Sequence, residues 1–480
     1  MNRLLYSLVL LVCLPALLCA KEIKIRGYVT NITSPDSFEV EDYRISRASG
    51  MTVEIEKDEE SGNVEFRPES LRVGTLVEIK GDHNETTGEL KATSIRFILE
   101  EFKHIKRTAL IDEVPAMEKT PEGWVGTFLA DGEQIQVGSQ TQVLFKLNKS
   151  QKALGKLEAK QNVTKDTPDD AEVSAPLVSL DQTGPNTFIA YEGTRQPEGF
   201  ILASRVEFMR NELEKGEANM WKQLKVNVKA SNFTDQRPGE LRIAQIGKFK
   251  LVPNEEAQQY VRELGEKLIP EYQKTLPPGD PGKIPFQFYL VADKEANAFA
   301  TPNGIVVVHS AMFNMLENEA QLAAVMGHEI SHAVQEHTWR QQQYHRKKLT
   351  ALKIGAAIGS MWGGSSVTSL ANMIEGAVRN GYSRSLENQA DRIGLHYMLG
   401  SGYDIREAPR VWKVMTKAYG DQGTNLFWSS HDNNATRRSY LMAEIRSNYA
   451  GIDYSSLQKN DERYQKIAQL VKESTAKKKK

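Results

Sequence analysis

The sequence predicts a multidomain protein in which N-terminal all-β barrel or sandwich modules precede a mainly α, α+β domain. Apolar and polar residues alternate from Lys21 to about Phe97, which is the period of half-buried strands. From Asn254 onward, apolar residues recur instead at three- and four-residue steps, as in helices that bury one face. The chain has 480 residues, too many for a single hydrophobic core, so we expect two or three domains.

Residues 1–20 have the pattern of a signal peptide. Arg3 supplies the positive start, and an apolar run from Leu4 to Leu18 follows, which is short for a membrane-spanning helix. Both cysteines of the chain lie inside this segment, so the mature chain would need no disulfide. We therefore expect an exported protein, periplasmic or extracellular, and an uncleaved N-terminal anchor is the alternative.

The charge balance offers no electrostatic case for a nucleic-acid partner. The formal net charge is −1, and 26% of the residues are charged. We therefore expect no nucleic-acid binding, while a peripheral association with a membrane stays open.

The first β-module is predicted at 21–101. Turn signals such as Ser34-Pro35-Asp36 and Ser61-Gly62-Asn63 separate its strands, as in a small antiparallel β-barrel or sandwich. The module resembles bacterial OB-like domains, some of which bind oligonucleotides or sugars. Because no basic and aromatic residues cluster here, a structural or protein-binding role is the better expectation.

A second, related β-module is predicted at 102–210. The stretch GELKATSIRF, from Gly88 to Phe97, resembles GFILASRVEF, from Gly199 to Phe208, and another glycine precedes each stretch, at Gly81 and at Gly193. Two unrelated strand pairs that end in similar hairpins are the alternative.

The other predicted segments follow from changes in composition and periodicity. They are a mobile insertion in the second module at 151–175, a connector at 211–239, the α+β domain at 240–450, and a C-terminal helix with a basic tail at 451–480. Inside the α+β domain we expect a helix from Asn254 to Tyr272 and strands from Phe286 to Val291 and from Ile305 to His309.

A metal-binding motif lies on the predicted helix from Asn318 to Val334. In the sequence HEISH, His328 and His332 are one turn apart and point the same way, so that both can bind one zinc ion. Glu329 between them can reach a water on the metal. The alternative is a chance pair of histidines on a solvated helix.

The third ligand is predicted on a second helix, from Ser385 to Leu399. Glu387 would complete a site of two histidines and one glutamate that keeps one position open, as catalytic zinc requires. Asp391, one turn on, could accept the far N–H of a zinc-bound histidine. Gly327 and Gly394 would let the two helices approach closely. Taken alone, this segment could equally be an ordinary charged helix face.

These residues resemble the zinc metallopeptidase family that includes the CAAX prenyl protease, HtpX and BepA, which are gluzincins with HExxH and ExxxD motifs. The resemblance extends from about Ile246 to Ile445. It is carried by His328-Glu329-x-x-His332, Ser383-Arg384-x-x-Glu387-x-x-Ala390-Asp391-Arg392-x-Gly394, Phe288 to Val291, Asn297 to Ala300, Pro302-Asn303-Gly304 and Glu319 to Ala323. It implies that His328, His332 and Glu387 bind one zinc ion per chain, that Glu329 is the catalytic base and that Asp391 supports a ligand.

The resemblance also implies further site residues. An edge strand beside the zinc could pair with an extended peptide, with Asn297 and Ala298 as the candidates for substrate contact, and an ordinary β-connection is the alternative. The family usually has His-Pro where this chain has His431-Asp432, followed by an arginine in register, here Arg437. Either His431 or Arg437 could stabilise the charge of the tetrahedral intermediate.

Two further predictions concern the surroundings of the site. His337 lies five residues after His332, roughly 140° around a continuous helix, so it should face elsewhere. Small residues at 351–377 predict two short helices that could form a lid, with a static hairpin as the alternative.

The predicted function is an exported zinc-dependent metalloendopeptidase acting on polypeptide substrates in envelope protein quality control. Glu329 would take a proton from water and pass it to the leaving amine. The alternative is a zinc-containing envelope chaperone or scaffold whose β-modules bind partners.

Overall fold

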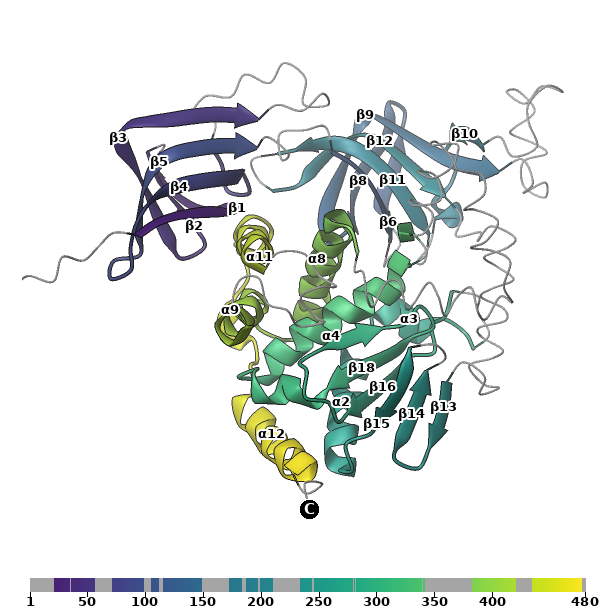
Figure 1. Ribbon diagram of the computed structural model, residues 1–480. Helices are drawn as coiled ribbons and strands as arrows, with labels where there is room; N and C mark the ends of the chain where they lie inside the picture. The colour runs from purple at the N-terminus through teal and green to yellow at the C-terminus, as the bar shows by residue number, and fades with distance from the viewer. Residues whose placement is uncertain are drawn as a thin grey trace, which may run out of the picture.

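The computed structural model has the predicted layout of β-modules followed by a helix-rich domain (Figure 1). It describes residues 21–34, 36–56, 71–98, 105–111, 115–148, 172–183, 187–196, 199–209, 234–243, 246–278, 280, 282–338, 340–341, 382–419 and 434–476. The predicted signal peptide, the lid segment and most of the predicted insertion lie outside these residues. Among the described helices, none has the length and apolarity needed to cross a bilayer.

The first module is a closed five-stranded barrel. Its strands are β1 (Lys21–Ser34), β2 (Ser37–Val40), β3 (Tyr43–Glu56), β4 (Leu76–Asn84) and β5 (Glu89–Ile98). The order around the barrel is β1-β2-β3-β5-β4, and β1 pairs with β4 to close it. We expected an antiparallel barrel, but the β3–β5 pair is parallel. The reason is that β4 lies between β3 and β5 along the chain, whereas in the sheet it pairs with the other side of β5. The resemblance to OB-like domains stays a prediction.

The second module is a seven-stranded sheet that lies over the helices in Figure 1. Its strands are β6 (Ile105–Leu110), β7 (Ala116–Thr120), β8 (Gly123–Ala130), β9 (Glu133–Asn148), β10 (Glu172–Pro176), β11 (Phe188–Arg195) and β12 (Ile201–Met209). The order is β6-β11-β12-β9-β8-β7, with β10 paired to β9.

The two modules share their strand pairing. Each contains a hairpin, β4–β5 in the first module and β11–β12 in the second. The first strand of the hairpin pairs antiparallel with the first strand of the module, β1 or β6. The second strand of the hairpin pairs parallel with a long strand, β3 or β9. The register shifts at the same point of each hairpin, next to Gly81 in one and Gly193 in the other. This agreement supports the predicted relationship between the modules, whose exact boundaries stay predictions.

The C-terminal domain contains two small sheets. The first contains β13 (Thr234–Arg237), β14 (Glu240–Ile243) and β15 (Gly247–Lys250), so a strand of it lies within the stretch 211–239 that was predicted as a connector. The second contains β16 (Gln287–Val291), β18 (Ile305–His309) and β17 (Ala298–Ala300) in that order, so β17 is an edge strand. The β16–β18 pair is parallel.

The described residues of this domain also form seven α-helices. They are α2 (Glu255–Leu268), α3 (Glu271–Thr275), α4 (Glu319–Val334), α8 (Arg384–Gly400), α9 (Glu407–Tyr419), α11 (Asn434–Asn448) and α12 (Asp461–Ala476). Asn254 and Asn318 cap α2 and α4 through their side-chain oxygens. The predicted helix from Asn254 to Tyr272 ends earlier, at Leu268, because Pro270 cannot continue it and α3 starts anew.

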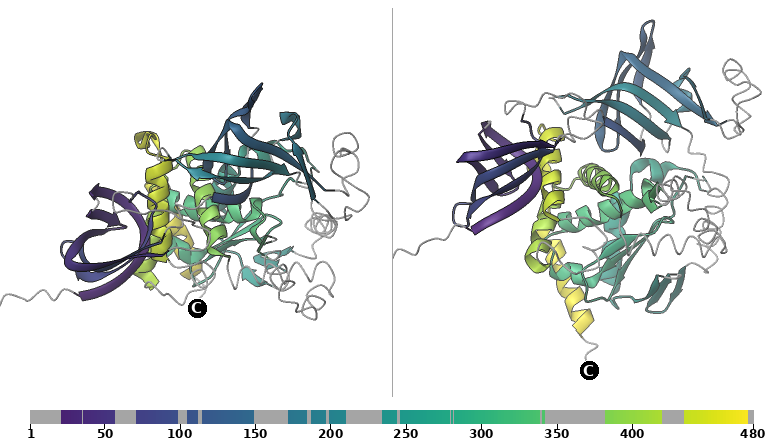
Figure 2. Two further views of the ribbon diagram at one scale, coloured as in Figure 1. Left: turned by 90° about the horizontal axis from the view of Figure 1, so that it is seen from above. Right: turned by 45° about the horizontal axis from the view of Figure 1, so that its top comes forward.

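Both β-modules contact the helices that carry the predicted site. The first barrel packs on α11, which stands between it and α8 in both views of Figure 2. There, the backbone N–H of Tyr28 donates to the hydroxyl of Ser439 at 2.8 Å, and Arg438 binds Asp42 at 2.8 Å. The second module packs on α8, and the metal-site helices are therefore held from two sides.

Candidate metal centre

The site lies where α4 and α8 cross. A β-carbon added to Gly327 would lie 3.3 Å from the carbonyl oxygen of Gly394, and one added to Gly394 would lie 3.2 Å from the backbone nitrogen of His328. The two helices therefore approach as closely as their backbones allow, as predicted. This contact brings the first turns of α8 against the histidines of α4.

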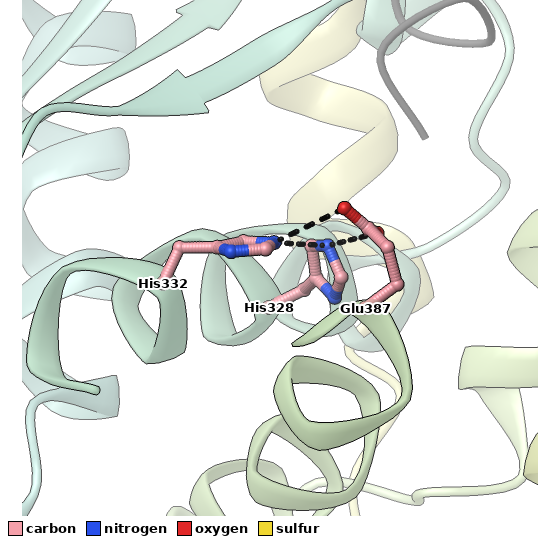
Figure 3. A group of neighbouring side chains, drawn as sticks. All are labelled: His328, His332 and Glu387. Atoms are coloured by element: carbon pink, nitrogen blue, oxygen red, sulfur yellow. Dashed lines mark hydrogen bonds and ion pairs between the residues drawn. The ribbon is translucent and has the colours of Figure 1, made fainter. Parts of the chain in front are cut away.

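The two histidines and the glutamate converge on one point (Figure 3). One ligand atom from each of His328, His332 and Glu387 lies within 4.8 Å of the others, and all three side chains are buried. The two Nε2 atoms are 2.9 Å apart, and the carboxylate oxygens of Glu387 lie 3.4 Å from Nε2 of His328 and 3.7 Å from Nε2 of His332. Two imidazole nitrogens and a carboxylate are the donor set of a catalytic zinc site.

The outer nitrogen of His328 is bound by a carboxylate. Its Nδ1 lies 3.0 Å from Asp391, which also accepts two hydrogen bonds from Arg437, at 2.6 and 2.9 Å. Arg437 reaches Glu387 as well, at 2.9 Å, and its guanidinium lies 3.9 Å from the centre of the Trp412 ring. One buried arginine thus forms ion pairs with both of these carboxylates.

The outer nitrogen of His332 faces His337, which corrects the prediction for that residue. The two Nδ1 atoms are 2.8 Å apart, and His337 is completely buried. The prediction assumed a continuous helix, but α4 ends at Val334 and Glu336 has a φ of 54°, so the chain turns back toward the site. The ring of Tyr382 stacks on His332 at 4.0 Å between ring centres.

Glu329 points toward the edge strand. Its Oε2 accepts a hydrogen bond from the backbone N–H of Ala300 in β17 at 3.1 Å. Backbone groups that point away from the paired strand recur at every second residue. The N–H and C=O of Ala298 therefore face the same side of β17 as the N–H of Ala300, away from β18. Asn297 precedes this strand, is buried, and its Oδ1 has no hydrogen-bond partner among the described residues.

Burial and charge shift the pKa values of three of these groups. Burial and Arg437 act to lower the pKa of His328, but hydrogen bonds to Asp391 and Glu387 outweigh them and raise it to about 9. Burial acts to raise the pKa of Asp391, but Arg437 and His328 lower it overall. Burial, reinforced by Arg340, lowers the pKa of His337 to about 3, so this ring is neutral near pH 7.

The sequence-predicted site residues thus fall into two groups. Those that the structure brings together are His328, Glu329, His332, Glu387, Asp391 and Arg437. Ala298 lies on β17, whose Ala300 contacts Glu329, and Asn297 precedes that strand, so their role in substrate contact stays a prediction. His431 lies outside the described residues. The sequence analysis did not identify His337, Tyr382 or Trp412, whose positions depend on a turn and on packing that helical periodicity does not reveal.

Comparisons with known proteins match two regions of the chain. Residues 255–445 match the model of peptidase family M48, and residues 26–96 match a domain of unknown function, DUF5666. The first match contains every residue of the candidate metal centre. The second lies within the first β-barrel.

Curated relatives match part of the chain. The beta-barrel assembly-enhancing protease of Escherichia coli K12 is 32% identical over 184 residues, covering 36% of each chain. The mitochondrial metalloendopeptidase OMA1 of Arabidopsis thaliana is 30% identical over 161 residues, covering 34% of this chain and 32% of its own. The chain therefore spans about a third of the length of these relatives.

Proposed function

We propose, from the match of residues 255–445 to peptidase family M48, that the chain is a zinc-dependent metalloendopeptidase. The observation that carries the proposal is the convergence of His328, His332 and Glu387 beside Glu329, a pattern of ligands and base that suits peptide hydrolysis. The names of the relatives, which are proteases, favour the same activity.

The residues fit a zinc ion. The ligand atoms are two imidazole nitrogens and a carboxylate, and each histidine has a partner at its outer nitrogen, as zinc-bound histidines do. A bound zinc ion would polarise the scissile carbonyl and lower the pKa of water. Glu329, which lies between the two histidines in the sequence, would be next to the water and the carbonyl that a bound zinc ion activates.

Glu329 is the proposed general base. It takes a proton from the attacking water and later delivers it to the nitrogen of the leaving amine. The hydrogen bond from Ala300 holds its Oε2 toward β17, where a substrate would lie. This hydrogen bond orients the carboxylate relative to β17.

The substrate is proposed to bind as an extended peptide along the edge of β17 that faces away from β18. The backbone groups of Ala298 face the site and can pair with the peptide, and Oδ1 of Asn297 can accept one of its N–H groups. Arg437 is bound to Asp391 and Glu387, which favours a role in holding these carboxylates over direct contact with the transition state.

We also propose that the protein acts on polypeptides in the cell envelope. The apolar N-terminal segment with the features of a signal peptide favours export. The name of the bacterial relatives, beta-barrel assembly-enhancing protease, fits quality control of envelope proteins.

The test is Glu329→Gln in the full chain. We expect this variant to keep one zinc ion, measured by elemental analysis, while its cleavage of an unfolded protein falls by at least about 100-fold, because the base is lost. His328→Ala is the matched metal-site variant and should lose the zinc ion as well. Turnover retained in pure Glu329→Gln protein would rule out this base, and binding of unfolded proteins without cleavage by the wild type would favour the chaperone alternative.

A further inference from the structure

We propose that Asp131 of the second β-module sets the tautomer of the metal ligand His332, through Gln389 and His337. The inference rests on the proposed zinc site and extends it to a module that lies outside the peptidase family match. Three side chains, those of Asp131, Gln389 and His337, link the β8–β9 turn to the metal ligand His332. At each contact, the donor or acceptor role of one group determines the role of the next.

The first step is the orientation of the Gln389 amide. A carboxylate only accepts hydrogen bonds, so the NH₂ group of Gln389 must face Asp131, and it also donates to the carbonyl of Thr108 at 3.2 Å. The amide oxygen then points the other way. Arg340 confirms this orientation, because its guanidinium donates to that oxygen at 2.6 Å.

The second step is the placement of the protons on the rings of His337 and His332. Nε2 of His337 lies 2.8 Å from the amide oxygen of Gln389, so Nε2 must carry the proton. In the neutral ring, Nδ1 of His337 is then an acceptor, and it lies 2.8 Å from Nδ1 of His332. His332 must therefore be protonated at Nδ1, which leaves its Nε2 with a lone pair directed at the metal position.

Asp131, at the other end of this series of contacts, is held in place by several hydrogen bonds. Asp131 is buried and accepts hydrogen bonds from Arg392 at 2.6 Å and from the Tyr191 hydroxyl at 3.1 Å. The backbone carbonyl of Asp131 accepts another from Arg392, at 2.9 Å. Gly132 in the same turn lies so close to α8 that a β-carbon there would be 2.9 Å from the backbone of Arg392.

The two metal histidines thus have the same kind of support from different sources. Nδ1 of His328 faces a carboxylate of the peptidase domain, Asp391, directly. Nδ1 of His332 faces a carboxylate of the second β-module through two intervening side chains. The second module is, in this proposal, a part of the metal centre, and Asp131, Gln389 and His337 are positioning residues.

The experiment compares the full-length wild type with Gln389→Leu. In metal-free protein labelled with ¹⁵N-histidine, nuclear magnetic resonance should show His332 as the Nδ1–H tautomer in the wild type and as a mixture in the variant. Zinc affinity, measured by competition with a chelator, should fall by about 10- to 100-fold, the usual loss when the partner of a metal-binding histidine is removed.

Tyr191→Phe is the control, because it removes a hydrogen bond to the other oxygen of Asp131 and leaves the Gln389 contact in place. It should keep both the tautomer and the zinc affinity. His337→Phe is the second variant, which keeps a ring but removes the acceptor, and it should repeat the effect of Gln389→Leu.

Two results would overturn the inference. One is an unchanged His332 tautomer in both Gln389→Leu and His337→Phe. The other is an equal loss of zinc affinity in Tyr191→Phe and Gln389→Leu. Failure of the proposed function is distinguishable, because a wild type that binds no zinc would still report its tautomer in the metal-free protein.

Discussion

At the scale of single residues, each metal-binding histidine depends on the partner of its outer ring nitrogen. His328 and His332 are one helical turn apart, which the sequence shows, but their outer nitrogens face Asp391 and His337, which come from other segments. Such partners orient a ligand and fix its tautomer, and they account for much of the affinity of a metal site.

Asp391→Asn tests the support of His328. The amide still fills the space but brings an NH₂ group against Arg437, so one of the present contacts is lost. We expect zinc affinity to fall by about 10- to 100-fold, measured by chelator competition. Asp404→Asn makes the same chemical change at a buried carboxylate paired with Arg406, away from the metal centre, and should leave zinc affinity unchanged. Equal affinities in wild type and Asp391→Asn would refute the role.

Glu407→Gln tests a buried carboxylate that binds the start of α4. Burial acts to raise the pKa of Glu407, but hydrogen bonds from Asn318, Lys459 and Gln321 lower it below its usual value of 4.5. Because the folded-state pKa is the lower one, this stabilisation is complete above the unfolded value and disappears as the pH falls through the folded value.

We therefore expect Glu407→Gln to lose about 1–3 kcal/mol of unfolding free energy at pH 7, the cost of weakening charged hydrogen bonds in a buried site. The deficit relative to wild type should shrink below pH 4.5. Chemical unfolding of both proteins between neutral and acid pH measures it, and a deficit that does not change with pH would contradict the assignment.

At the scale of elements, the crossing of α4 and α8 determines whether the ligands meet. Gly327 and Gly394 allow backbone contact between these helices. The histidines follow Gly327 on α4 and Glu387 precedes Gly394 on α8, so this contact determines whether the ligands meet. Larger residues would push the helices apart and move Glu387 away from the histidines.

Gly394→Val tests this contact. The added atoms would meet the backbone of His328, with a cost of about 1–3 kcal/mol from overpacking and a loss of zinc affinity. Gly400→Val is the matched control on α8, since a β-carbon there meets nothing within 4 Å. Zinc affinity and the unfolding midpoint should both fall for Gly394→Val, and the idea fails if the two variants behave alike.

At the scale of the whole molecule, the two β-modules contact different helices of the C-terminal domain. One barrel binds α11, which carries Arg437, and the second module inserts its β8–β9 turn against α8, which carries Glu387 (Figure 2). The contact of the second module buries Asp131 and Arg392, two charged groups that need each other as partners, so this module and the C-terminal domain should unfold together.

Gly132→Ala tests the second contact. The residue has a φ of 69° and its β-carbon would meet the backbone of Arg392. Gly239→Ala shares the strained backbone, with a φ of 75°, but meets nothing within 4 Å. We expect Gly132→Ala to be less stable than this control by about 1–3 kcal/mol, with faster amide exchange in α8. Matching exchange rates in the two variants would show that the turn does not hold the helix.

Periodicity and motif spacing predicted a large part of this protein. The alternation of apolar residues predicted the β-modules, the helical period predicted α2, α4 and α8, and the spacing of His328, Glu329 and His332 predicted the metal helix. These features are local, because a helix or a strand places residues a few positions apart in known directions.

Only the tertiary structure decided what lies around the metal ligands. The turn after Val334 brings His337 back to His332, and the approach of α8 to the second β-module joins Gln389 to Asp131. These contacts connect residues that are far apart in the chain or separated by an irregular turn. Their geometry follows from how the elements pack, which no local period of the sequence encodes.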